Sequence, residues 1–158
     1  MSREINIATQ RRLTDNLNDG DVEAAVLAFS ERVVDHDPAP GQGRGREGLR
    51  TLFEELSEAF TDLHVEPVRL VADDQHVSIA YTLTGIHDGP FQGIEPTGRR
   101  VQVRGMQIAR FHHGEIIERW GRGAAPALAE QLSAEPDAGG TSGRFGRRGP
   151  IDSSSQMP

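Results

Sequence analysis

The sequence predicts an α+β domain in which helices cover one face of a curved, mostly antiparallel sheet. Three observations carry this prediction. Apolar residues recur at helical spacing in the first part of the chain, they alternate after residue 62, and Gly-, Asp- and Pro-rich turns separate the alternating segments. The 158 residues are enough for one domain with a buried core.

The first part of the chain is expected to hold two helices and a short strand. Apolar spacing predicts a helix over 5–18, which an Asn-Asp-Gly-Asp turn ends. Asp21 in that turn is a candidate N-cap for a second helix that reaches Phe29. Residues 32–37 then alternate, which predicts a strand, and the Pro- and Gly-rich segment after them stops it.

A third helix over 45–60 carries an apolar stripe that commits it to a core. The later elements are expected to be strands over 63–72, 76–86, 99–111 and 115–121 and a short helix over 125–132. The folded domain is therefore expected to span 1–133. The composition beyond it turns to Gly, Ser, Arg and Pro, and so few apolar residues cannot offset the entropy of ordering. Residues 134–158 are expected to be a disordered tail.

The residue types narrow the chemistry. The chain has no cysteine, and all 17 of its basic residues are arginine. Thiol nucleophiles, disulfides, Schiff-base catalysis and a P-loop lysine are therefore excluded. The remaining groups are His, Asp, Glu, Arg, Tyr and amides, which favour proton transfer or binding over covalent catalysis.

Charge and hydropathy limit the partners. No apolar run approaches the length of a membrane span, and the N-terminus lacks the apolar stretch of a secretory signal, so we expect a cytoplasmic protein without a membrane partner. The net charge is −7, and the densest basic group of the expected folded region, Arg99, Arg100 and Arg104, is flanked by acidic helices. Nucleic-acid binding is not expected, because it requires a basic face.

An ordered series of motifs resembles the SnoaL-like polyketide or ester cyclases. The motifs are Val-Val-Asp-His-Asp-Pro at 33–38, Gly-Arg-Glu-Gly at 45–48, Tyr-Thr-Leu-Thr-Gly-Ile-His at 81–87, Phe-Gln-Gly-Ile-Glu-Pro-Thr-Gly at 91–98 and Gly-Glu-Ile-Ile-Glu-Arg-Trp at 114–120. The resemblance covers about 5–132. It implies the cone-shaped α+β barrel of the nuclear-transport-factor-2-like superfamily. It also implies ring closure by intramolecular aldol condensation without a metal or organic cofactor, with an aspartate in the last strand as the acid/base.

The sequence departs from this family at the acid/base position. After the tryptophan, family members commonly read Asp-x-x-Asp, whereas this chain has Gly121 and Ala124 there. Aldol closure needs a base that removes a proton beside a carbonyl and a group that stabilises the enolate. The standard aldol reaction is therefore not expected from these positions.

Strand alternation sorts the later side chains into faces. One face of the long strand after the Gly-rich loop holds Val101, Val103, Gly105, Gln107, Ala109 and Phe111. This set is small and apolar with one amide, as expected for the lining of a ligand cavity. In the last strand, the resemblance places Arg119 inward together with Ile117 and Gly121.

Two histidines are candidate catalytic residues. His36, at the end of the first strand, would be a base tuned by a neighbouring carboxylate, or else a half-exposed residue bonded to a loop. His87 would assist at the pocket mouth, or else only tie down the Gly-rich loop. Asp35 and Asp37 lie on the strand face opposite to His36, so an inward His36 would keep the two carboxylates from both reaching the cavity.

Gln107 and Arg119 are the other catalytic candidates, and they would stabilise an enolate. Gln107 could instead satisfy neighbouring backbone groups. Arg119 could instead pair with Asp35, Asp37 or Glu118 and hold the barrel together. Convergence of His36, Gln107 and Arg119 on one point would favour an enzyme, whereas an Arg119 closed into an ion pair would favour a binding protein.

The expected substrate-binding residues are Phe53, Tyr81, Gly105, Trp120 and Gly121. No cofactor is expected, and the adjacent turn residues His112 and His113 are too weak a signal for a metal site.

The leading hypothesis is a polyketide cyclase-like enzyme of secondary metabolism, such as antibiotic biosynthesis. It would be an isomerase or intramolecular lyase that acts by acid/base chemistry on an apolar, oxygenated small molecule. The alternative is a binding or assembly protein with the same fold that has lost catalysis. A third interpretation, epoxide opening, requires two inward carboxylates. A homodimer through the sheet is also expected, which would bury Met106 and Ile108.

Overall fold

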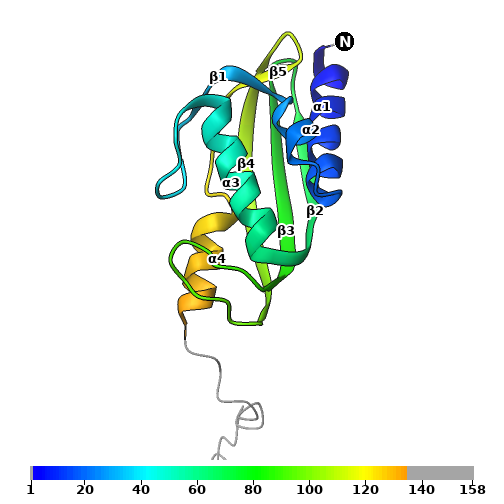
Figure 1. Ribbon diagram of the computed structural model, residues 1–158. Helices are drawn as coiled ribbons and strands as arrows, with labels where there is room; N and C mark the ends of the chain where they lie inside the picture. The colour runs from blue at the N-terminus through cyan, green and yellow to red at the C-terminus, as the bar shows by residue number, and fades with distance from the viewer. Residues whose placement is uncertain (1, 135–158) are drawn as a thin grey trace, which may run out of the picture.

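The computed structural model describes residues 2–134 and has the expected α+β class (Figure 1). Its elements are α1 (Ser2–Asn18), α2 (Val22–Val26), β1 (Phe29–Asp35), α3 (Gly45–Ala59), β2 (Phe60–Ala72), β3 (His76–His87), β4 (Arg100–His112), β5 (Glu115–Trp120) and α4 (Ala124–Ser133). Their order and type match the sequence pattern. The tail expected at 134–158 lies outside the described residues except for Ala134. Within 2–134, no helix is both long and apolar enough to cross a membrane.

The start of the chain differs in detail from the expectation. Asp21 caps α2 as predicted, since its side chain accepts a hydrogen bond from the amide of Ala24 at 3.0 Å. The helix ends at Val26, however, and Phe29 opens β1 instead of closing the helix. The first strand therefore begins earlier than 32 and ends at Asp35, so His36 lies just beyond it.

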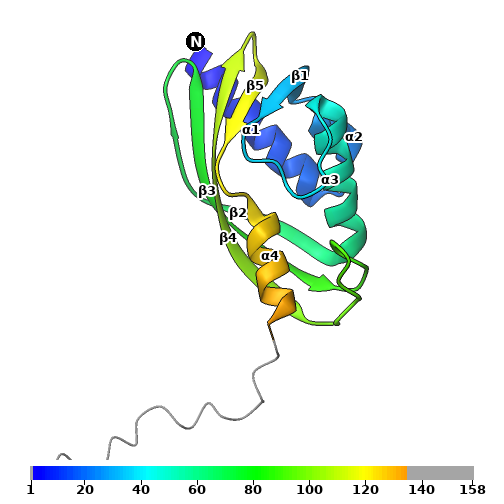
Figure 2. The ribbon, with the colours of Figure 1, turned by 90° about the vertical axis from the view of Figure 1, so that its left-hand side faces the viewer.

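The strands form a single five-stranded sheet in the order β1-β5-β4-β3-β2. All neighbours are antiparallel except β1 and β5, which are parallel. The sheet is strongly curved, and the helices lie on its concave side (Figure 2). β1 and β2 form its two edges, so the sheet is open rather than closed.

A bulge in β5 changes which side chains face inward. Phe111 of β4 pairs with Ile116, but its neighbour Arg110 pairs with Glu118, which leaves one extra residue in β5. Ile116 and Arg119 therefore both point to the helix side, and Ile116 is fully buried. Strict alternation assigned Ile116 to the outer face, and that assignment was wrong because the bulge interrupts the period of two.

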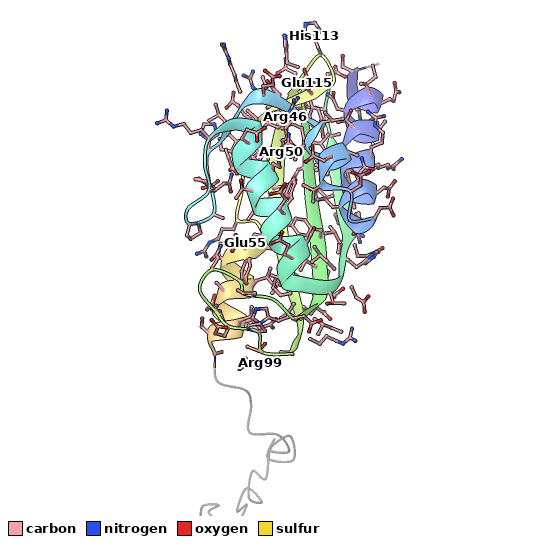
Figure 3. All side chains as sticks on the ribbon, in the orientation of Figure 1. Arg46, Arg50, Glu55, Arg99, His113 and Glu115 are labelled. Atoms are coloured by element: carbon pink, nitrogen blue, oxygen red, sulfur yellow. The ribbon has the colours of Figure 1, made fainter. Side chains whose placement is uncertain are left out.

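Helix α3 is fixed over the concave face by an apolar stripe and by one arginine. Leu49, Leu52 and Phe53 are buried, and burying each such side chain contributes roughly 1.5–3 kcal/mol. Arg46 donates to the carbonyl oxygen of Phe29 from Nη2 at 2.6 Å and from Nε at 2.9 Å. Arg46 lies at the upper end of α3, close to β1 and β5 (Figure 3).

Helix α1 is held by polar side chains that satisfy turns and strands. Asn6 donates to the carbonyl of Asp74 in the β2–β3 turn, and Thr9 donates to the carbonyl of Gly114 in the β4–β5 turn. Asn18 donates to the carbonyl of Val65 and accepts from its amide. These contacts explain why a helix of mostly polar composition packs against β2 and β3.

Candidate functional site

A cavity of about 290 Å³ lies between the helices and the concave face of the sheet. Apolar side chains form most of its wall: Leu13, Leu17, Phe29, Leu52, Phe53, Leu56, Leu63, Val65, Ile79 and Leu83. Polar groups gather at the end near β1, β5 and the start of α4: Asp35, Asp37, Gln42, Tyr81, Gln107, Arg119 and Arg122. This combination suits an apolar ligand with a polar group at that end.

Arg119 is the central cation of the polar end, and its side chain is only 11% exposed. The parallel pairing of β1 with β5 sets it opposite Asp35, and its Nη1 donates to Asp35 Oδ2 at 3.2 Å. Its Nη2 donates to Gln107 Oε1 at 2.8 Å. Gln107 and Arg119 thus both line the cavity as predicted, and they contact each other.

Both hydrogen-bonding oxygens of Asp35 are occupied within the protein. Oδ2 accepts from Gln42 Nε2 at 2.9 Å as well as from Arg119, and Oδ1 accepts from the amide of Asp37 at 3.1 Å. Asp35 therefore holds the guanidinium of Arg119 in place and has little capacity for proton transfer.

Asp37 is the carboxylate with a free oxygen. Its Oδ2 accepts from the amide of Gly121 at 2.7 Å, while Oδ1 has no hydrogen-bond partner among residues 2–134. The side chain is exposed and lines the cavity. The expectation that Asp35 and Asp37 would not both reach the cavity was wrong.

Gly121 stands where the resemblance implies an aspartate, and it acts here through its backbone. Its φ is +119°, and a Cβ at this position would lie 2.4 Å from the carbonyl oxygen of Met106. A side chain therefore does not fit. Gly121 does not line the cavity. Its amide instead orients Asp37, a carboxylate on the segment after β1.

Tyr81 contributes a hydroxyl to the polar end. Its ring lies over Gly105, where a Cβ would be 2.3 Å from the ring carbon Cζ. The hydroxyl oxygen accepts from the amide of Ala124 at 3.1 Å and keeps its proton for a ligand. Burial raises the pKa of Tyr81, and the nearby charge of Arg119 only partly opposes this, so the hydroxyl stays neutral.

Two donors converge on Gly123. A Cβ at Gly123 would lie 3.7 Å from Arg119 Nη2 and 3.8 Å from the Tyr81 hydroxyl oxygen. Gly123 lines the cavity and has no side chain, so the space in front of its Cα, between these two donors, is open to a ligand atom. An oxygen bound there could accept hydrogen bonds from a cation and from a phenol, which is the arrangement that stabilises a developing oxyanion.

His36 lies outside the cavity wall, which corrects the expectation of an inward base. Its ring stacks on Trp120 with the centroids 4.9 Å apart, and Nε2 is 2.9 Å from Glu118 Oε2. Trp120 likewise lies away from the cavity. The strand ends at Asp35, and Asp35 is the residue that turns inward to meet Arg119.

His87 is fully buried but does not line the cavity. Its Nδ1 accepts from the amide of Thr97 at 3.1 Å and lies 3.0 Å from the Thr97 hydroxyl. Its ring packs against Phe60 with the centroids 5.4 Å apart. His87 therefore holds the Gly-rich loop in place, as the alternative interpretation stated. The prediction that His87 lies at the pocket mouth was wrong.

Phe53 and Tyr81 line the cavity, whereas Gly105 lies under the ring of Tyr81 and does not. No group of three or more His, Cys, Asp or Glu side chains that could hold a metal occurs within the described part of the chain. Asp37 was not predicted as a site residue. The face that it shares with Asp35 was expected to point away from the cavity, because His36 was assigned inward.

The model of the SnoaL-like polyketide cyclase family matches residues 7–132. The chain belongs to this family. The motif series therefore predicted the SnoaL-like polyketide cyclase family correctly. A search of curated proteins gives no match.

Solved structures agree with the assignment to the SnoaL-like polyketide cyclases. AclR from Streptomyces galilaeus, a proposed hydroxylase, is 26% identical with a TM-score of 0.70, covering 84% of this chain and 87% of AclR. A proposed SnoaL-like polyketide cyclase from Jannaschia sp. CCS1 is 25% identical with a TM-score of 0.71, covering 85% and 95%. TsrD from Streptomyces laurentii shares the fold, with 24% identity, a TM-score of 0.75 and coverage of 85% and 99%. The cone-like, nuclear-transport-factor-2-like fold is thereby confirmed.

Proposed function

We propose that this protein is a cofactor-independent enzyme of secondary metabolism that moves a proton next to a carbonyl in a polyketide-like small molecule. The observation that carries the proposal is the convergence of Arg119 and Tyr81 on the open point at Gly123. Asp37, with one free carboxylate oxygen, lies in the same cavity wall. A base and two oxyanion donors at the end of an apolar cavity are the groups that enolisation requires.

The geometry supports the following steps. The substrate carbonyl oxygen accepts hydrogen bonds from Tyr81 and from Arg119 Nη2. Asp37 Oδ1 takes a proton from the carbon beside that carbonyl, and the electron pair moves to the oxygen to form the enolate. The enolate carbon then either attacks a second carbonyl of the same molecule, which closes a ring, or takes a proton at another position. Asp37 returns the proton to the new alkoxide or to carbon, so the reaction is neutral overall.

Gln107 and Asp35 act as positioning residues in this scheme. Each accepts one hydrogen bond from the guanidinium of Arg119, which fixes the remaining donors in the direction of Gly123. Gln42 in turn holds Asp35. A fixed cation costs no reorganisation when the oxyanion forms.

The cavity volume limits the substrate. About 290 Å³ is at the lower end of ligand pockets, which run from roughly 300 to 1,000 Å³. A skeleton of two or three fused rings matches this volume, and so does a folded chain of similar size.

The bicyclic ketone 2-tetralone provides a direct test because its protons beside the carbonyl exchange with solvent. NMR in D2O would follow the exchange catalysed by the wild-type protein, by Asp37→Asn and by the exposed control Asp15→Asn. We expect Asp37→Asn to lose about 10²- to 10⁴-fold of the catalysed rate, the usual contribution of a general base, and Asp15→Asn to lose none. Equal rates for wild type and Asp37→Asn would refute the role of Asp37.

A non-catalytic binding protein is the second candidate. The bonds from Arg119 to Asp35 and Gln107, together with its low exposure, favour it. The same experiment separates the two functions. An enzyme accelerates exchange of bound 2-tetralone, whereas a binding protein shifts its resonances without accelerating exchange.

A homodimer through the outer face of the sheet is part of the proposal. Met106 is 62% exposed, Ile108 is 44% exposed and Val71 is 67% exposed, and large apolar residues grouped on one sheet face favour association. Sedimentation velocity should give a dimer for the wild type and a monomer for Ile108→Glu. Leu27→Glu, an exposed apolar residue outside the sheet, is the control and should leave the dimer intact. A monomeric wild type would contradict this part.

A further inference from the structure

Gln10 on α1 carries a buried amide oxygen without a protein partner. The residue is 2% exposed, and its Oε1 makes no hydrogen bond within residues 2–134. Other polar side chains of α1 at the helix–sheet contact, Asn6, Thr9 and Asn18, each bond to a turn or strand. An unpaired buried amide oxygen is costly to stability, so it points to a partner that the folded chain does not supply.

The amide belongs to the ligand cavity. Gln10 lines it together with Thr14, whose hydroxyl donates to the Gln10 carbonyl at 3.2 Å and keeps its lone pairs free to accept. Gln10, Thr14 and Ile79 also line a second hollow of about 220 Å³ between α1 and β2. Gln10 therefore stands in the partition between the main cavity and this outer hollow.

Gln10 lies across the sheet from Asp35 and Arg119. Helix α1 packs against β2 and β3, whereas Asp35 and Arg119 belong to β1 and β5 at the other side of the sheet. Ile79, which pairs with Gln107 across β3 and β4, occupies the wall between the two polar ends. A ligand that fills the cavity thus meets one polar group at each end and apolar side chains between them.

We infer that Gln10 binds an oxygen substituent of the substrate at the end remote from the reacting carbonyl and so selects substrates that are oxygenated at both ends. A primary amide donates and accepts, so it recognises a hydroxyl in either role. The inference rests on the proposed function for the reacting end but assigns a separate residue to the far end. It makes Gln10 a specificity-determining residue and not a catalytic one.

A matched ligand series tests this inference by binding alone. Isothermal titration would compare 2-tetralone with its 6-hydroxy and 7-hydroxy derivatives, which carry the hydroxyl on the ring remote from the ketone. We expect one hydroxylated compound to bind wild type about tenfold more tightly than 2-tetralone, the effect of one net hydrogen bond. Gln10→Met should lose this preference and keep the affinity for 2-tetralone. Preference retained by Gln10→Met, or absent from wild type, would overturn the inference.

Two further measurements distinguish substrate selection by Gln10 from the proposed reaction and from a purely structural role of its amide. Asp37→Asn should retain the hydroxyl preference even though it loses proton exchange, so failure of the proposed reaction and failure of the Gln10 inference give different results. Without ligand, Gln10→Met should melt at the same temperature as wild type or higher, because the unpaired amide is gone. The exposed control Gln75→Met should melt unchanged. A lower melting temperature for Gln10→Met would assign the amide a structural role and overturn the inference.

Discussion

At Gly123 a missing side chain leaves room for a ligand oxygen between Arg119 and Tyr81. The backbone there has φ −69°, which alanine adopts, and the added methyl would make ordinary contacts of 3.7 and 3.8 Å. Gly123→Ala should therefore change the free energy of unfolding by less than about 1 kcal/mol. It should weaken binding of 2-naphthol, a planar enol counterpart of 2-tetralone, by about tenfold or more, measured by fluorescence titration. Unchanged affinity would place the ligand oxygen elsewhere.

Single residues also mark the limit of what the sequence could predict. Alternation placed Gln107 correctly, because the period of two is regular around it in β4. The resemblance placed Arg119 inward correctly, although the bulge interrupts the alternation of β5. The inward assignment failed for His36, since the strand predicted to reach residue 37 ends at Asp35, and Asp35 faces the cavity instead. The contact between Arg119 and Asp35 depends on the parallel register of β1 and β5, which no local pattern encodes.

At the scale of elements, the connection from β5 to α4 depends on Gly121. Its positive φ and the close approach of Met106 allow no side chain, and its amide holds Asp37. Gly121→Ala should lower the free energy of unfolding by roughly 1–3 kcal/mol or more, measured by urea denaturation. Gly123→Ala is the matched control two residues away. Equal stability of the two variants would contradict this account of the turn.

The elements themselves were predictable where their patterns are long and regular. The apolar stripe of α3 and the alternation of β3 and β4 gave their positions to within one or two residues. The end of α2 and the bulge in β5 could not be read, because each depends on packing against other strands. Gln10 also gave no signal, since a glutamine in a polar helix does not differ in sequence from its exposed neighbours.

At the scale of the whole molecule, an ion-pair cluster on the outer sheet face links stability to pH. Hydrogen bonds from His36 and then from Arg110 lower the pKa of Glu118 below its ordinary value of 4.5. Because the pKa of Glu118 is lower in the folded than in the unfolded state, ionised Glu118 stabilises the fold at pH values above its unfolded-state pKa. This contribution to the free energy of unfolding disappears as the pH falls through the folded-state pKa of Glu118. Urea denaturation should show that the stability difference between wild type and Glu118→Gln shrinks below about pH 4.5. A difference that stays constant down to about pH 2 would contradict this link.

A crystal structure of the complex with 2-naphthol would show whether Arg119, Tyr81 and Asp37 together form an enolisation site. The account predicts that the naphthol oxygen lies within hydrogen-bond distance of both the Tyr81 hydroxyl and Arg119 Nη2, above Gly123. It also predicts that the ring carbon next to that oxygen faces Asp37 Oδ1. A naphthol oxygen bound away from Arg119 and Tyr81, or a ring that keeps its reactive carbon out of reach of Asp37, would contradict the claim that these residues perform enolisation.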